Sequence, residues 1–171
     1  MAATKQHPEP WLRGTLAEVS VVQRAVMHAL VLAQEDLELW CGGFSDAELN
    51  ARRADIAPMA FHLRHIAQSL DRLLTYAEGR PLNDEQIVAM NTELDPLTAH
   101  RELFAELASA LETSAKRIRA IDPRSLEEAR SVGKKQLPTT VGGLLIHVAE
   151  HTQRHVGQAL TTAKIVAAHL K

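Results

Sequence analysis

The stretch that decides the fold is residues 141–169, VGGLLIHVAEHTQRHVGQALTTAKIVAAH. Its apolar residues recur at intervals of three and four, which predicts an amphipathic helix, and Thr139 or Thr140 is placed to cap its start. A helix this long with one apolar face needs other elements to bury that face. The apolar positions are Leu144, Val148, Val156, Leu160, Ala163 and Val166.

Three more stretches of similar length repeat this pattern towards the N-terminus. The first follows the capping box Thr15–Glu18 and ends at Gly42, the second covers 58–78, and the third begins after Asp95-Pro96 and ends at Ile121. The connections between them are long and contain short helices, two of which begin with the capping boxes 45–48 and 83–86. Residues 125–133 form one more turn, 134–138 a loop, and no stretch predicts a strand. We therefore predict an all-α fold, a four-helix bundle with long connections that carry short helices.

Composition and charge limit the classes of protein that remain. The chain has 171 residues, 46% hydrophobic and 23% charged, which fits one domain at 15–171 preceded by a mobile arm at 1–14. A net charge of −2 argues against a nucleic-acid or membrane partner. The single cysteine, Cys41, cannot form an intramolecular disulfide, and no signal peptide or membrane-spanning stretch is expected. These features favour a cytoplasmic location.

Histidines carry the functional signal. His147, His151 and His155 lie at i, i+4 and i+8 of the last helix and share one stripe. Neighbours four apart can bind one ion, but eight residues rise about 12 Å, so the outer two cannot share it. The spacing therefore allows either 147 with 151 or 151 with 155.

A third ligand has to come from another helix if the ion is to keep an open position. His62 and His65 share a face of the second long helix and are the best candidates, whereas His28 and His100 are weaker ones. The spacing leaves an alternative open, in which these histidines are boundary residues hydrogen-bonded to carboxylates such as Glu150.

Two segments of the sequence resemble the DinB-like superfamily, which includes YfiT-like proteins. They are FHLRHIA at 61–67, with Ser69 and Asp-Arg-Leu at 71–73, and LPTT at 137–140 leading into HVAEHTQRHVGQ at 147–158. The resemblance implies a divalent metal held in the bundle by His65, His151 and His155, with His62 as the fallback for His65. His147 is then an extra histidine. Val156 departs from the pattern, because many relatives carry arginine there.

The resemblance also implies metal-dependent chemistry on a small molecule. Relatives include thiol transferases that use bacillithiol or mycothiol and a mycothiol-dependent maleylpyruvate isomerase, and many are homodimers. We expect a homodimer that binds Zn or Ni, with Mn, Fe or Co as alternatives, and that transfers a low-molecular-weight thiol to an electrophile or hydrolyses a substrate.

Two other interpretations compete with this one. In the first, the protein is not an enzyme but a dimeric module that a metal stabilises or that senses a metal. In the second, it is an enzyme that uses residues 147–151 as an inverted zinc-protease motif with Glu150 as base.

Overall fold

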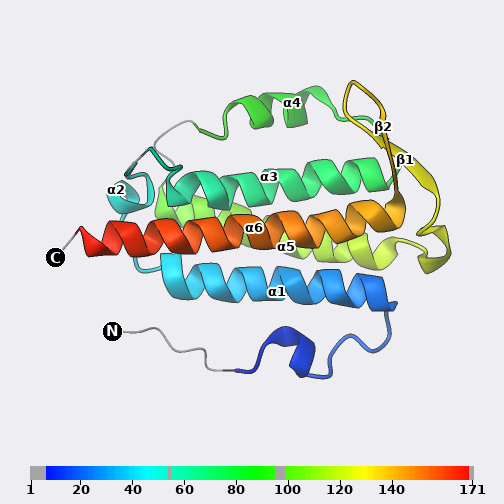
Figure 1. The fold of residues 1–171 in the computed structure, drawn as a ribbon, viewed down its shortest axis with the longest axis horizontal. Coiled ribbons are helices and arrows are strands. Elements are labelled where there is room, and N and C mark those ends of the chain that lie inside the picture. The colour runs from blue at the N-terminus through cyan, green and yellow to red at the C-terminus, as the bar shows by residue number, and fades with distance from the viewer. Residues whose placement is uncertain (1–6, 54, 95–98, 170–171) are drawn as a thin grey trace.

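The computed structural model describes residues 7–53, 55–94 and 99–169 and confirms the four-helix bundle (Figure 1). The long helices are α1 (Val21–Cys41), α3 (Met59–Ala77), α5 (His100–Ala120) and α6 (Val141–Ala168). Helix α6 packs on α1 and α3, and α5 packs on the same two helices. Helices α1 and α3 are therefore diagonal neighbours, although they follow each other along the chain.

The direction of the helices explains the long connection between α3 and α5. Figure 1 shows α3 and α5 running the same way, with α1 and α6 running the opposite way. The chain must therefore return along the whole length of the bundle between α3 and α5. The return segment contains α4 (Asp84–Asn91), which lies along α3. The other short helices are η1 (Pro10–Leu12), α2 (Asp46–Leu49) and η2 (Pro123–Ser125).

The prediction of a strand-free loop before α6 is wrong. Strands β1 (Ala129–Val132) and β2 (Leu137–Thr140) form an antiparallel hairpin in which Ala129 pairs with Thr140. The turn uses left-handed backbone at Gly133 (φ 70°) and Gln136 (φ 50°). Each strand has only four residues, which is too short to show a clear alternation of apolar and polar residues in the sequence.

The predicted cap of the first helix is also wrong. Leu16 has φ 61°, which breaks the helical path directly after Thr15, and the Thr15 hydroxyl instead lies 3.1 Å from His28 Nε2. Helix α1 begins five residues later, where Ser20 and Gln23 form the capping box. The boxes at Ser45 and Asn83 and the Thr140 cap of α6 are confirmed. The predicted Asp95-Pro96 start of α5 lies outside the described residues.

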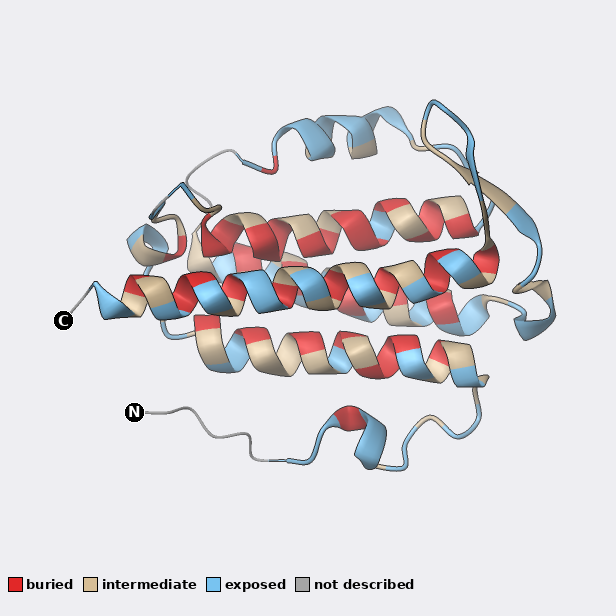
Figure 2. Ribbon diagram, viewed as in Figure 1, coloured by how far each residue is buried: buried red, intermediate tan, exposed pale blue. Residues whose placement is uncertain are grey.

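The core fills the space between the four long helices, whose inward faces are buried while α4 and the N-terminal segment are mostly exposed (Figure 2). Burial raises the pKa of the Cys41 thiol to about 12, so this side chain is a small apolar core residue. Before α1, Arg13 forms a two-pronged ion pair with Glu35 of that helix. Among the described residues, no helix combines the length and hydropathy needed to cross a bilayer. The largest fully buried apolar side chains are Leu37, Leu49, Met59, Leu63, Ile66, Leu70, Leu74, Leu103, Leu107, Ile118 and Leu145.

Candidate metal centre

Helices α3 and α6, which pack closely together, bring the histidines of the two sequence motifs into contact. Pro58 precedes α3 and suits a helix start, so Phe61, His62 and His65 lie within its first two turns. His151 and His155 lie in the middle of α6, one turn apart, on the side that faces α3. Helix α6 therefore supplies two neighbouring imidazoles, and α3 supplies the histidines that face them.

The structure brings together the three histidines that the resemblance implies as ligands. His65 Nε2 lies 2.8 Å from His151 Nε2, and one ring nitrogen of each of His65, His151 and His155 lies within 4.8 Å of the other two. Nitrogens bound at about 2.1 Å to a tetrahedral ion are about 3.4 Å apart, which lies within this range. The donor set and its spacing therefore fit a divalent ion, and each ring is only partly buried.

The other histidines lie outside this group of three. His62, the fallback ligand, contacts one member of the group, with its Nδ1 3.0 Å from Nδ1 of His155. The ring of His147 is 5.4 Å from that of His151, and its Nδ1 lies 3.8 Å from an exposed oxygen of Glu150. The weaker candidates His28 and His100 contact Thr15 and the carbonyl of Gly42.

A buried carboxylate, which the sequence analysis missed, holds His65 in place. Glu93 is 7% exposed, and its Oε2 lies 2.6 Å from His65 Nδ1 while its Oε1 lies 2.7 Å from an Arg72 guanidinium nitrogen. We assign the His65 proton to Nδ1, where it is donated to the carboxylate. The lone pair of Nε2 then points towards His151. A carboxylate that orients a histidine in this way is the usual support of a metal ligand.

The electrostatics favour the protonation state that ligands need. Burial first, and then the proximity of other histidines, lowers the pKa of His62, His151 and His155 to about 4. Burial alone would raise the pKa of Glu93, but its bonds to His65 and Arg72 outweigh burial and hold that pKa below its ordinary value. At neutral pH, His62, His151 and His155 are therefore uncharged and Glu93 is ionised.

Phe61 forms one wall of the centre. Its ring stacks on His65 at 5.2 Å between centroids and meets the edges of His62 and His155. The aromatic wall restricts ring rotation and excludes water from one side of the cluster.

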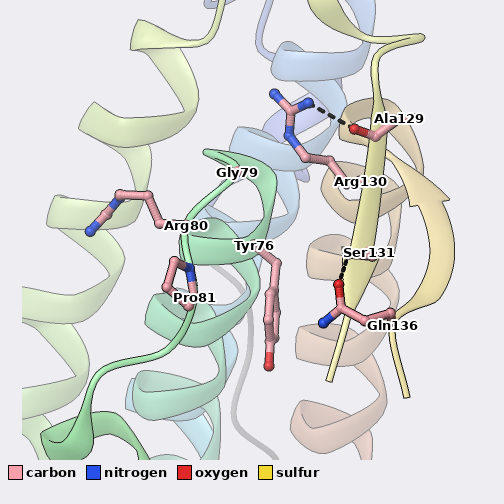
Figure 3. A pocket seen from close by; sticks show the side chains of 8 residues that line it. All are labelled: Tyr76, Gly79, Arg80, Pro81, Ala129, Arg130, Ser131 and Gln136. Atoms are coloured by element: carbon pink, nitrogen blue, oxygen red, sulfur yellow. Dashed lines mark hydrogen bonds between the residues drawn. The ribbon is translucent and has the colours of Figure 1, made fainter. Parts of the chain in front are cut away.

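A cavity of about 580 Å³ lies at the other end of the bundle, between the end of α3 and the hairpin (Figure 3). Tyr76, which lines it, is eleven residues after His65, a rise of about 16 Å along α3. Its Arg130 guanidinium already bonds to the carbonyls of Ala77 and Ala129 and to Glu128. This cavity is therefore remote from the histidines and offers no free cation from Arg130.

A helical bundle that gathers histidines from two facing helices is an architecture used by metalloproteins. Residues 29–159 match the family model of the DinB superfamily, so the chain belongs to that superfamily. The matched region contains all three clustered histidines. A comparison with curated proteins gives no match.

Among solved structures, the chain is similar to YfiT from Bacillus subtilis, which is described as a probable metal-dependent hydrolase with an unusual four-helix bundle topology. The TM-score is 0.68 at 11% identity, and the match covers 87% of this chain and 90% of YfiT. The similarity establishes the shared fold.

Proposed function

We propose that this protein is a metal-dependent enzyme that acts on a small molecule and that His65, His151 and His155 hold its divalent ion. The observation that carries the proposal is the convergence of three imidazoles, one of them anchored by a buried carboxylate. Three protein ligands leave at least one position open for water or substrate. The description of YfiT as a probable metal-dependent hydrolase agrees with this proposal.

The ion, when bound, would act as a Lewis acid that lowers the pKa of a water or thiol. The residues around it supply little further acid-base help. Both Glu93 oxygens are engaged by His65 and Arg72, and Glu150 points to His147 at the exposed surface. Neither of these two carboxylates is therefore free to act as a base at the three-histidine cluster.

This shortage favours thiol transfer over hydrolysis. A thiol has an ordinary pKa near 8.5, whereas that of water is about 15.7, so a thiol needs less help to become a nucleophile. We therefore place transfer of a low-molecular-weight thiol to an electrophile first and hydrolysis second. Zinc and nickel are the first metals to test. The homodimer and the cytoplasmic location remain predictions.

The fold argues against a purely structural metal. The buried side chains of the four helices form one apolar core, and the histidines lie at its partly exposed edge. We therefore expect removal of the ion to leave the fold intact and to abolish activity. If chelation unfolds the protein or dissociates a dimer, the non-enzymatic module becomes the better interpretation.

The test is elemental analysis of tag-free protein after dialysis with Zn²⁺ or Ni²⁺, combined with circular dichroism. We expect about one ion per chain in the parent, and loss of the ion in folded His65→Ala, His151→Ala and His155→Ala. The matched control is His147→Ala, which removes a neighbouring histidine outside the cluster. A parent that binds no metal would overturn the proposal. Loss in His147→Ala with retention in His155→Ala would instead support the inverted-protease register.

A further inference from the structure

We propose that a groove of about 420 Å³ beside α6 binds a small anionic molecule with an apolar body and holds it against His62, next to the histidine centre. The link to the centre rests on the proposed function, whereas the anion site itself does not. The lining residues used below are Ile56, His62, Arg154, Gly157, Thr162 and Ile165.

The shape of the groove fits a small organic molecule. Its volume lies within the range of about 300–1,000 Å³ typical of ligand sites. Two isoleucines, Ile56 from the segment before α3 and Ile165 from α6, supply apolar surface. Thr162 ties the two segments together through a 3.4 Å hydrogen bond from its hydroxyl to the carbonyl of Ala57. The walls are thus connected in the absence of a ligand.

Gly157 keeps the groove open. It lies in the interior of α6, where glycine costs about 1 kcal/mol relative to alanine. Close helix packing does not explain its presence, because a Cβ atom added there would meet nothing within 4 Å. Gly157 is exposed and lines the groove, so a larger side chain at this position would occupy the space that a ligand needs.

Arg154 gives the groove a free positive charge. It is exposed, and within the described ranges it has no hydrogen-bond or ion-pair partner. It directly precedes His155 in α6 and lines the groove together with His62, so its charge lies close to the cluster. A divalent ion on the cluster would add charge of the same sign. Both charges would attract an anionic ligand.

His62 connects the groove to the centre. It lines the groove, is 5% exposed, and places its Nδ1 3.0 Å from Nδ1 of His155. A molecule in the groove would therefore be separated from a proposed metal ligand by a single imidazole. The arrangement assigns the apolar body to the isoleucine walls and the anionic group to Arg154.

Two fluorescent probes with the same rings test the inference: anilinonaphthalene sulfonate, which is anionic, and phenylnaphthylamine, which is neutral. We expect Arg154→Gln to weaken binding of the sulfonate about tenfold, the size of a lost charged contact, and to leave the neutral probe unchanged. Gly157→Leu should weaken both probes at least tenfold because it fills the groove. Zinc loading of the parent should tighten binding of the sulfonate alone.

The matched controls are Arg80→Gln, an exposed arginine of the remote cavity, and Gly43→Leu, another exposed glycine with nothing within 4 Å of an added Cβ. Both should bind the probes as the parent does. Binding of the sulfonate that is equal in the parent, Arg154→Gln and Gly157→Leu would overturn the inference, as would no binding to the parent. Elemental analysis of the same samples separates the two proposals: metal without groove binding refutes only the groove, and groove binding without metal refutes the metal centre.

Discussion

Glu93→Gln is the most informative single substitution, because Glu93 lies outside the predicted ligand set but contacts one of its members. The amide oxygen can still accept the proton of His65 Nδ1, now 2.6 Å from the carboxylate. The negative charge that makes the imidazole a stronger ligand is lost. Substitution of a carboxylate that supports a metal ligand typically costs about 10–100-fold in metal affinity. We expect a loss in that range, equivalent to about 1.4–2.7 kcal/mol.

The same change also affects the apo protein. Arg72 has a side chain only 10% exposed, and its guanidinium lies 2.7 Å from Glu93. Loss of the charge leaves that arginine buried with a neutral neighbour. Full removal of one partner of a buried pair costs about 3–5 kcal/mol. Because glutamine retains hydrogen-bonding groups, we expect a smaller loss of about 1–3 kcal/mol in the free energy of unfolding.

Zinc affinity is measured by competition with a chromophoric chelator, and stability by urea unfolding of the metal-free protein. Glu150→Gln is the matched control, since Glu150 is exposed and lies beside His147 rather than the cluster. It should change neither quantity. A folded Glu93→Gln protein with the zinc affinity of the parent would refute the role of Glu93 as the support of His65.

Three further predictions concern stability. In metal-free protein, the lowered pKa values of His62, His151 and His155 mean that the unfolded state binds more protons than the folded state between about pH 4 and pH 6.5. The free energy of unfolding should therefore fall as the pH falls through that window. A urea midpoint that is the same at pH 7.5 and pH 5 would contradict this prediction. Gly157→Ala should stabilise the protein by up to about 1 kcal/mol in thermal unfolding, because the added methyl group meets open space, and a lower melting temperature would show a hidden contact. Ser20→Ala should cost about 1 kcal/mol in the free energy of unfolding by removing the cap of α1, and an unchanged stability of Ser20→Ala would refute the observed helix start.

The sequence predicted the four helices because their apolar spacing and caps are local properties. We predicted the start of α1 at Thr15–Glu18, but Ser20–Gln23 has the same capping-box pattern and forms the observed cap. The left-handed backbone at Leu16 excludes a helix start at Thr15, and the local sequence does not predict that conformation for a leucine. The hairpin was missed because four-residue strands are too short to show a period.

Part of the candidate site could likewise be predicted from the sequence, and part depends on how the helices pack. Spacing alone paired histidines along α6 but left two registers open, and the resemblance implied His151 and His155. The packing of α3 on α6 groups these two with His65 and leaves His147 outside the cluster. Metal binding by the cluster is still a prediction. The sequence did not predict the contact of Glu93 with His65, because the two residues are 28 positions apart and the path of the connection between them depends on the topology.

That topology is what completes the centre. Helices α3 and α5 run the same way, so the chain after α3 must return to the end of the bundle where α3 begins (Figure 1), and His65 lies within the first two turns of α3. Glu93, in the described part of this return, lies next to His65 and Arg72 of α3. A bundle with tight turns would have had no segment there. The long connection, which is an entropic cost to folding, therefore supplies the carboxylate that orients the ligand from α3.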